Sequence, residues 1–149
     1  MSYMKTIHCL GFLGLLPFLC GLMLSATQYE IYGISGETVF ATYSLAILCF
    51  LAGAVWGQIL KIEASHAYQK NLIMTNVLVV IGWIAFLTSQ TLYVIGTIVL
   101  SIVFVGIFFL ELNLFRVFTT RQNGQYARLR IILTCIVVAA HGGMVAIHV

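Results

Sequence analysis

The side chains with the clearest chemical potential lie inside or beside otherwise apolar stretches of the chain. Glu111 is the only acid within such a stretch, and Arg130 opens the next apolar segment at a similar depth. Ionisable groups in hydrocarbon are costly, so they mark functional or tightly paired positions. The spacing predicts an ion pair between Glu111 and Arg130 that joins the last two apolar segments. We expect a structural role for this pair, and a proton or ion pathway is the alternative.

A second candidate site lies near the C-terminus. His141, Met144 and His148 follow i, i+3, i+7 spacing, so on a helix their directions fall within about 60° of one another. Two imidazoles and a thioether suit copper better than calcium or magnesium. The three residues also extend over roughly 10 Å of helix axis, which is too far for one ion without further ligands. We therefore expect no bound cofactor, and these three residues remain the candidate copper ligands.

Signatures of soluble and membrane enzymes are missing from the sequence. It contains no HExxH, no GxSxG, no phosphate-binding glycine loop and no paired carboxylates. Four cysteines lack CxxC spacing, which predicts small buried side chains rather than disulfides or a zinc site: Cys9, Cys20, Cys49 and Cys135. We expect no catalytic residues and no enzymatic activity.

The elements that carry these residues are transmembrane helices. Of 149 residues, 62% are hydrophobic and 7% are charged, and the mean hydropathy is +1.09. A soluble domain has about a quarter of its residues charged. Each apolar segment is close to the ~20 residues that cross a bilayer as a helix. The sequence predicts an all-α, polytopic membrane protein with one domain over residues 1–149 and five helices, at about 7–26, 38–60, 72–89, 91–113 and 129–148.

The charged residues predict the orientation of these helices. With five crossings, every basic residue falls on one side of the membrane: Lys5, Lys61, Lys70, Arg116, Arg121, Arg128 and Arg130. The opposite side has Glu30 and Glu37 and no basic residue. Because Lys and Arg collect in cytoplasmic loops, we expect the N-terminus inside, the C-terminus outside and a location in a bacterial inner membrane. The net charge of +3 is then a topology signal, so the expected partner is the lipid bilayer and not nucleic acid.

Small residues form stripes on the first two helices. On the second helix the spacings are 4, 3, 4 and 4 for Thr42, Ala46, Cys49, Gly53 and Gly57, and the last two form a GxxxG pair. The first helix has Gly11, Gly14, Gly21 and Ser25, with Pro17 expected to kink it. We expect the two stripes to pack together within one chain, with Trp56 near the inner boundary. A homodimer through Gly53 and Gly57 is the alternative.

Three stretches carry a resemblance: LGFLGLLPFLCG (10–21), YSLAILCFLAGAVWGQIL (43–60) and YARLRIILT (126–134). Together they resemble a family of small five-helix membrane proteins catalogued as a domain of unknown function, widespread in bacteria and with an animal relative in mitochondria. The matching positions are Gly14, Pro17, Gly53, Trp56, Gly57, Leu129, Arg130 and Thr134. Val55 departs from the family, in which many relatives carry a polar residue or histidine. The family's aspartate after the fourth helix is missing here, and Glu111 is the nearest acid. The resemblance implies a membrane bundle and no particular activity.

Three functions remain open at this level. A structural, accessory or assembly partner of a larger membrane complex fits a small chain with almost no aqueous domain. A small transporter or channel is the alternative, and it needs a polar path through the few internal groups such as Glu111 and His141. The second alternative is a copper- or cofactor-binding membrane protein.

Overall fold

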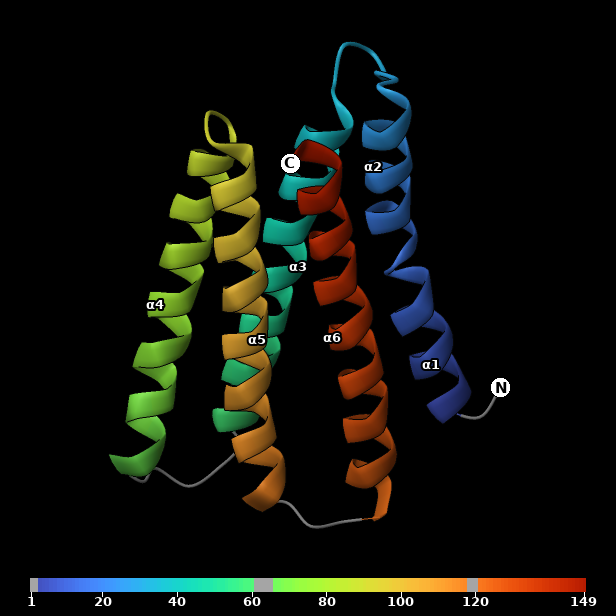
Figure 1. The fold of residues 1–149 in the computed structure, drawn as a ribbon. Coiled ribbons are helices and arrows are strands. Elements are labelled where there is room, and N and C mark those ends of the chain that lie inside the picture. The colour runs from blue at the N-terminus through green and yellow to red at the C-terminus, as the bar shows by residue number, and fades with distance from the viewer. Residues whose placement is uncertain (1–2, 61–65, 118–120) are drawn as a thin grey trace.

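The computed structural model describes residues 3–60, 66–117 and 121–149, and these fold as a bundle of long helices (Figure 1). The helices are α1 (Tyr3–Leu13), α2 (Leu16–Thr27), α3 (Gly36–Ile59), α4 (His66–Ser89), α5 (Tyr93–Val117) and α6 (Arg121–His148). Five segments are long and apolar enough to cross a membrane: Lys5–Thr27, Gly36–Ile59, Gln69–Ser89, Tyr93–Leu114 and Tyr126–His148. The all-α, five-span prediction is confirmed, and the first span consists of two helices, α1 and α2.

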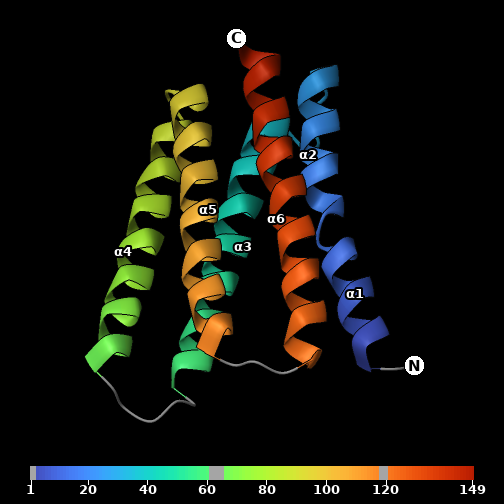
Figure 2. The same ribbon diagram turned by 60° about the horizontal axis from the view of Figure 1, so that its bottom comes forward.

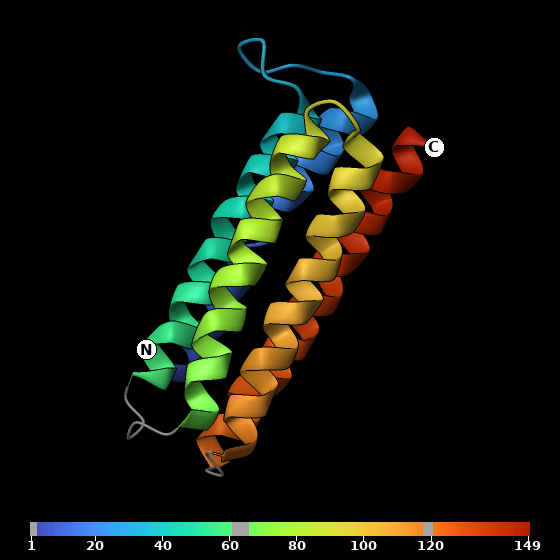
Figure 3. The ribbon, with the colours of Figure 1, turned by 90° about the vertical axis from the view of Figure 1, so that its left-hand side faces the viewer.

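The helices run alongside one another for most of their length (Figures 2 and 3). One end of the bundle carries the start of α1, the end of α3, the start of α4, the end of α5 and the start of α6, and we call it the N-terminal end. The other end carries the C-terminus and the α2–α3 and α4–α5 connections, and we call it the C-terminal end. The hairpin of α4 and α5 is joined by a short turn, as the sequence predicts.

The first span is interrupted where proline prevents a continuous helix. Pro17 lies at the start of α2 and has no N–H to donate to the carbonyl of Leu13. Within a bilayer, a freed backbone group needs another partner. The hydroxyl of Tyr43, on α3, donates to the carbonyl of Gly14 at 2.9 Å. The predicted kink is therefore a complete break between two helices, and a side chain from the next helix satisfies part of the exposed backbone.

Glycines mark the closest approaches between helices. A Cβ on Gly21 would lie 3.0 Å from the Cβ of Phe40, and one on Gly36 would lie 2.7 Å from the Gly21 carbonyl oxygen. A Cβ on Gly96 would lie 2.5 Å from the backbone nitrogen of Ser89. These positions bring α2 onto α3 and α4 onto α5 at distances that no larger residue permits. They supply the close backbone packing that stabilises helix pairs in lipid.

The predicted pairing of the two small-residue stripes is wrong. All five members of the α3 stripe, Thr42, Ala46, Cys49, Gly53 and Gly57, are exposed on the outer surface of the bundle. No atom of the described residues lies within 4 Å of a Cβ built on Gly53 or Gly57. The first-span stripe does face inward, with Gly21 and Ser25 buried, but it meets the opposite side of α3. Both faces of α3 are apolar, so small residues alone do not reveal which face turns inward.

The cysteines were also misplaced by sequence reasoning. Cys9, Cys20, Cys49 and Cys135 are all free and exposed on the outer surface rather than buried. A thiol is apolar enough to face lipid, so its position within an apolar segment does not imply burial in the protein.

The core consists of apolar side chains from α2, α3, α5 and α6. Its largest members are fully or almost fully buried: Phe18, Phe40, Leu48, Val55, Phe104, Ile107, Leu114 and Met144. Val55 has no exposed surface, so the residue that departs from the family resemblance packs here as an ordinary core side chain. This mostly apolar core, which also encloses His141, fills the middle of the bundle between polar clusters at its two ends.

Candidate functional site

The predicted ion pair forms near the N-terminal end of the bundle and joins α5 to α6. Arg130 donates to Glu111 Oε2 from Nε at 2.7 Å and from Nη2 at 2.5 Å. The hydroxyl of Tyr126 donates to Glu111 Oε1 at 3.3 Å. The side chains of Arg130 and Glu111 are only 8% and 2% exposed. A buried pair of this kind is stable because each charge neutralises the other and the hydrogen bonds replace water.

Beside this pair lies a groove of about 330 Å³ between the first span, α3, α5 and α6. Its walls are mostly apolar and include Leu10, Phe50, Leu133 and Val137. Its polar lining residues, Tyr126, Arg130 and Thr134, all come from α6. Gly11 and Leu133 both line this groove, and a Cβ added to Gly11 would lie 3.0 Å from Leu133 Cδ1. The expected packing role of Gly11 therefore involves α6 rather than α3.

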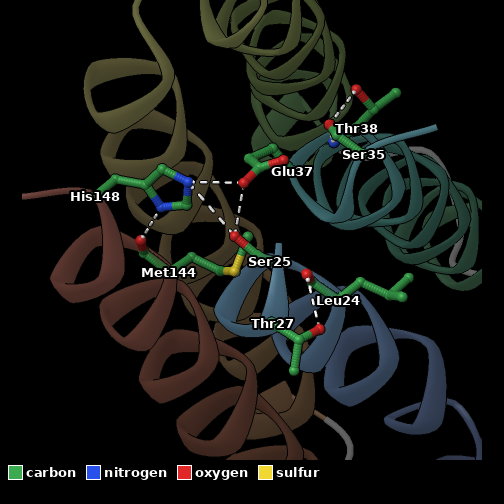
Figure 4. A network of polar contacts seen from close by, with 8 residues as sticks. All are labelled: Leu24, Ser25, Thr27, Ser35, Glu37, Thr38, Met144 and His148. Atoms are coloured by element: carbon green, nitrogen blue, oxygen red, sulfur yellow. Dashed lines mark hydrogen bonds and ion pairs between the residues drawn. The ribbon is translucent and has the colours of Figure 1, made fainter. Parts of the chain in front are cut away.

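A second polar cluster lies at the C-terminal end, where α2, α3 and α6 meet (Figure 4). The hydroxyl of Ser25 donates to Glu37 Oε1 at 2.7 Å, and His148 Nε2 lies 2.8 Å from the same oxygen. The other ring nitrogen, Nδ1 of His148, lies 2.8 Å from the carbonyl oxygen of Met144. Because both ring nitrogens face acceptors, the imidazole makes both bonds as a donor only when it carries a positive charge. The cluster then links three helices through an ion pair.

Sequence reasoning missed this cluster because its members are far apart in the chain. A weak signal was available: Ser35 begins α3 as an N-cap, accepting a hydrogen bond from the Thr38 N–H at 3.4 Å, and Glu37 follows in the first turn. An N-cap serine followed by an acid marks a helix start and favours a nearby cation. The identity of that cation, His148, depends on the tertiary fold.

The serine, glutamate and histidine do not form a hydrolytic triad. In a triad the acid bonds to one ring nitrogen and the serine to the other, so that the ring can take the serine proton. Here Glu37 and Ser25 both face Nε2 of His148, at 2.8 and 3.4 Å, and Ser25 donates directly to the carboxylate. The three side chains instead connect α2, α3 and α6 through contacts to the Glu37 carboxylate.

The candidate copper ligands occupy separate environments. His141 is 1% exposed and its ring packs against Phe18, Phe40 and Phe104, with centroid distances of 6.0, 4.9 and 5.4 Å. Its Nδ1 bonds to the Val137 carbonyl at 2.8 Å, and its Nε2 has no hydrogen-bond partner among the described residues. In contrast, His148 faces Glu37 at the end of the bundle.

Met144, between them, is a fully buried core residue. The structure thus does not bring these three residues onto one centre. Across the part of the chain that the structure describes, no three His, Cys, Asp or Glu side chains gather in a way that could hold a metal ion.

Five apolar spans, an inward-facing set of glycines and a buried ion pair define a polytopic helical membrane protein. A family model described as "Protein of unknown function (DUF3429)" matches residues 3–146, and the chain therefore belongs to this family. No curated protein and no solved structure matches the chain. The family description carries no activity, so function has to be argued from the geometry.

Proposed function

We propose that this protein is a structural or assembly subunit of a larger membrane complex, and that it holds a transmembrane helix of another subunit against the outer face of α3. The observation that carries this proposal is the exposed glycine pair. Gly53 and Gly57 have GxxxG spacing, and no described atom approaches within 4 Å of a Cβ built on either. With Thr42, Ala46 and Cys49 they form a strip of small side chains along α3.

Such a strip suits helix association in lipid. Lipid tails are as apolar as the helices, so association depends on close backbone packing, which small residues permit. An opposing helix at Gly53 and Gly57 gains van der Waals contacts that lipid chains supply less well. The remaining features support a rigid scaffold: Glu111 and Glu37 are each paired with a base, and a tightly packed, mostly apolar core that includes the buried His141 lies between these two pairs. A transport function would require that core to open.

The location of the subunit follows from the basic residues. Their concentration on one side of five crossings supports an N-terminus in the cytoplasm and a C-terminus outside, in a bacterial inner membrane. The absence of a triad geometry at Ser25, Glu37 and His148 supports a non-enzymatic role.

Substitution of the glycine strip tests the proposal. Gly57→Leu, expressed at native level, is expected to remove the protein from its native complex, because the branched side chain separates the two helix backbones. The matched control is Gly142→Leu, since Gly142 is also exposed with no described atom within 4 Å of its Cβ position. Native gel electrophoresis in mild detergent, with mass spectrometry of the co-purifying proteins, measures the complex.

Three outcomes distinguish the alternatives. Loss of the complex in Gly57→Leu but not in Gly142→Leu, with unchanged melting temperature, supports the proposal. If the lost partner is a second, differently tagged copy of this chain, the strip forms a homodimer and the assembly role is rejected. Equal migration of both variants and the wild type shows that the strip simply faces lipid.

A further inference from the structure

The groove beside Arg130 is open to the surrounding lipid. Its rim includes Leu10 of α1 and Phe50 of α3, which are 64% and 70% exposed. Along α6 its lining extends from Tyr126 to Val137, which corresponds to roughly 16 Å of helix at 1.5 Å per residue. That length is about half of the ~30 Å hydrocarbon core, which is the depth of one leaflet. Tyr126 is the first residue of the fifth span and Val137 lies near its middle, so the groove covers the N-terminal half of that span.

Two polar groups in this groove have hydrogen-bonding capacity that the protein does not use. Arg130 bonds to Glu111 through Nε and Nη2, and its Nη1 group makes no hydrogen bond to a described residue. Thr134, one helical turn further along α6, is 8% exposed, and its hydroxyl has no hydrogen bond among the described residues. The Arg130 side chain is itself only 8% exposed. Both side chains line the groove, and neither of these two atoms is among the fully buried unpartnered polar atoms of the described residues. A donor that faces an apolar groove without an acceptor is unfavourable, so their position at one end of this groove points to a ligand with an oxygen acceptor.

The charge of the site selects among such ligands. Arg130 is the basic residue in the groove lining, and Glu111 already neutralises it, so a negatively charged head group in the groove would lie next to the carboxylate. A neutral carbonyl oxygen accepts from Nη1 and from the threonine hydroxyl without that repulsion. The ester carbonyl of a membrane phospholipid has this chemistry, and it lies at the boundary between head groups and hydrocarbon.

We propose that this groove binds one acyl chain of a glycerophospholipid from the leaflet at the N-terminal end, with the ester carbonyl at Arg130 and Thr134 and the chain directed toward Phe18. Leu10 and Phe50 form the lateral entrance, and Phe18, Phe104 and Val137 receive the chain end. The site is independent of the glycine strip on α3. It goes beyond general solvation by lipid because it assigns one chain to one groove with a polar end at Arg130 and Thr134.

Photo-crosslinking tests the occupant directly. The full chain is reconstituted in nanodiscs of phosphatidylcholine that contain a small fraction of the same lipid with a diazirine in its sn-2 chain, and adducts are mapped by tandem mass spectrometry. The groove residues Leu129 and Leu133 are compared with Ile131 and Ile132, which lie at the same depth on the same helix but are 44% and 48% exposed on the outer surface. We expect about fivefold more adduct at Leu129 and Leu133, a ratio that corresponds to one net hydrogen bond.

Two variants test the cause of this preference. Leu51→Trp fills the groove from α3 and is expected to reduce adducts at Leu129 and Leu133 to the level of Ile131. The matched control Ile102→Trp adds the same ring on an exposed part of α5, at a residue that is 63% exposed, and is expected to leave the ratio unchanged. Thr134→Val removes only the hydroxyl and is expected to lower the ratio about fivefold.

Size-exclusion profiles and melting temperatures are measured for each variant, so a change in adduct yield can be distinguished from a loss of folding. Equal adduct yields on groove and outer-surface residues of the folded wild type overturn the proposal. It is also overturned if a different small molecule, such as a quinone, is extracted from the purified protein in equimolar amount and blocks the adducts.

Discussion

Removal of one partner of the Glu111–Arg130 pair is expected to destabilise the bundle strongly. In the Glu111→Leu variant, Arg130 loses its two hydrogen bonds of 2.7 and 2.5 Å. The Arg130 side chain is only 8% exposed in the wild-type structure, so its charge stays buried without a partner. An uncompensated buried charge costs about 3–5 kcal/mol. Arg130→Leu leaves the Glu111 carboxylate with the Tyr126 hydroxyl, at 3.3 Å, as its one hydrogen-bond partner among the described residues, so a loss of the same order is expected.

The double variant Glu111→Leu/Arg130→Leu removes both charges, and its stability is expected to return to within about 1–2 kcal/mol of the wild type. The remaining loss comes from the Tyr126 hydroxyl, which no longer has a carboxylate acceptor and costs about 0.5–1.5 kcal/mol. Equilibrium unfolding in mixed micelles, followed by far-ultraviolet circular dichroism, measures all four proteins. Lys70→Leu is the control, because this exposed charge is expected to change stability by less than about 0.5 kcal/mol.

Additive stability losses in the two single variants and the double variant would contradict the predicted pairing of Glu111 with Arg130. If the double variant loses the sum of the two single losses, each residue stabilises the bundle by packing alone. If either single variant loses less than about 0.5 kcal/mol, water reaches the pair and the burial argument fails.

Two further predictions concern packing and orientation. Gly36→Ala is expected to destabilise the fold by about 1–3 kcal/mol, because the added Cβ overlaps the backbone of α2. Gly53→Ala, on the outer surface, is expected to be neutral or to stabilise α3 by up to about 1 kcal/mol. Equal melting temperatures of the two variants would contradict the close approach of α2 to Gly36. On a cysteine-free background, Tyr32→Cys and Val149→Cys are expected to react with a membrane-impermeant maleimide added outside the cell. Ser65→Cys is expected to react only after the membrane is permeabilised. Labelling of Ser65→Cys from outside would show that the orientation is the reverse of the predicted one.

Much of the bundle was predictable because the relevant signals are local. The five apolar segments, the turn between the third and fourth spans and the interruption at Pro17 follow from residue composition and from the missing proline N–H. The Glu111–Arg130 pair was predictable for a different reason. An acid and a base at similar depth on adjacent spans have few alternatives in hydrocarbon, so each becomes the other's partner.

Other features depend on long-range geometry and were not predictable. Ser25, Glu37 and His148 come from three helices, and nothing in their local sequence indicates that they meet. The groove is of the same kind, because its walls come from the first span, α3, α5 and α6. His141, Met144 and His148 share a helical face by spacing, yet the structure gives the two histidines different partners.

By itself, the sequence determined that this is a five-span helical membrane protein and that its first span is interrupted at Pro17. It also determined which small residues align along α3 and that Glu111 pairs with Arg130. Only the tertiary structure decided the side of α3 to which Gly53 and Gly57 turn, and therefore that the strip lies on the outer surface of the bundle. The physical reason is that lipid and protein interior are both apolar. In water, an apolar face must turn inward, but in a bilayer either face of an apolar helix is acceptable to its surroundings, and the choice is made by the fit between neighbouring helices.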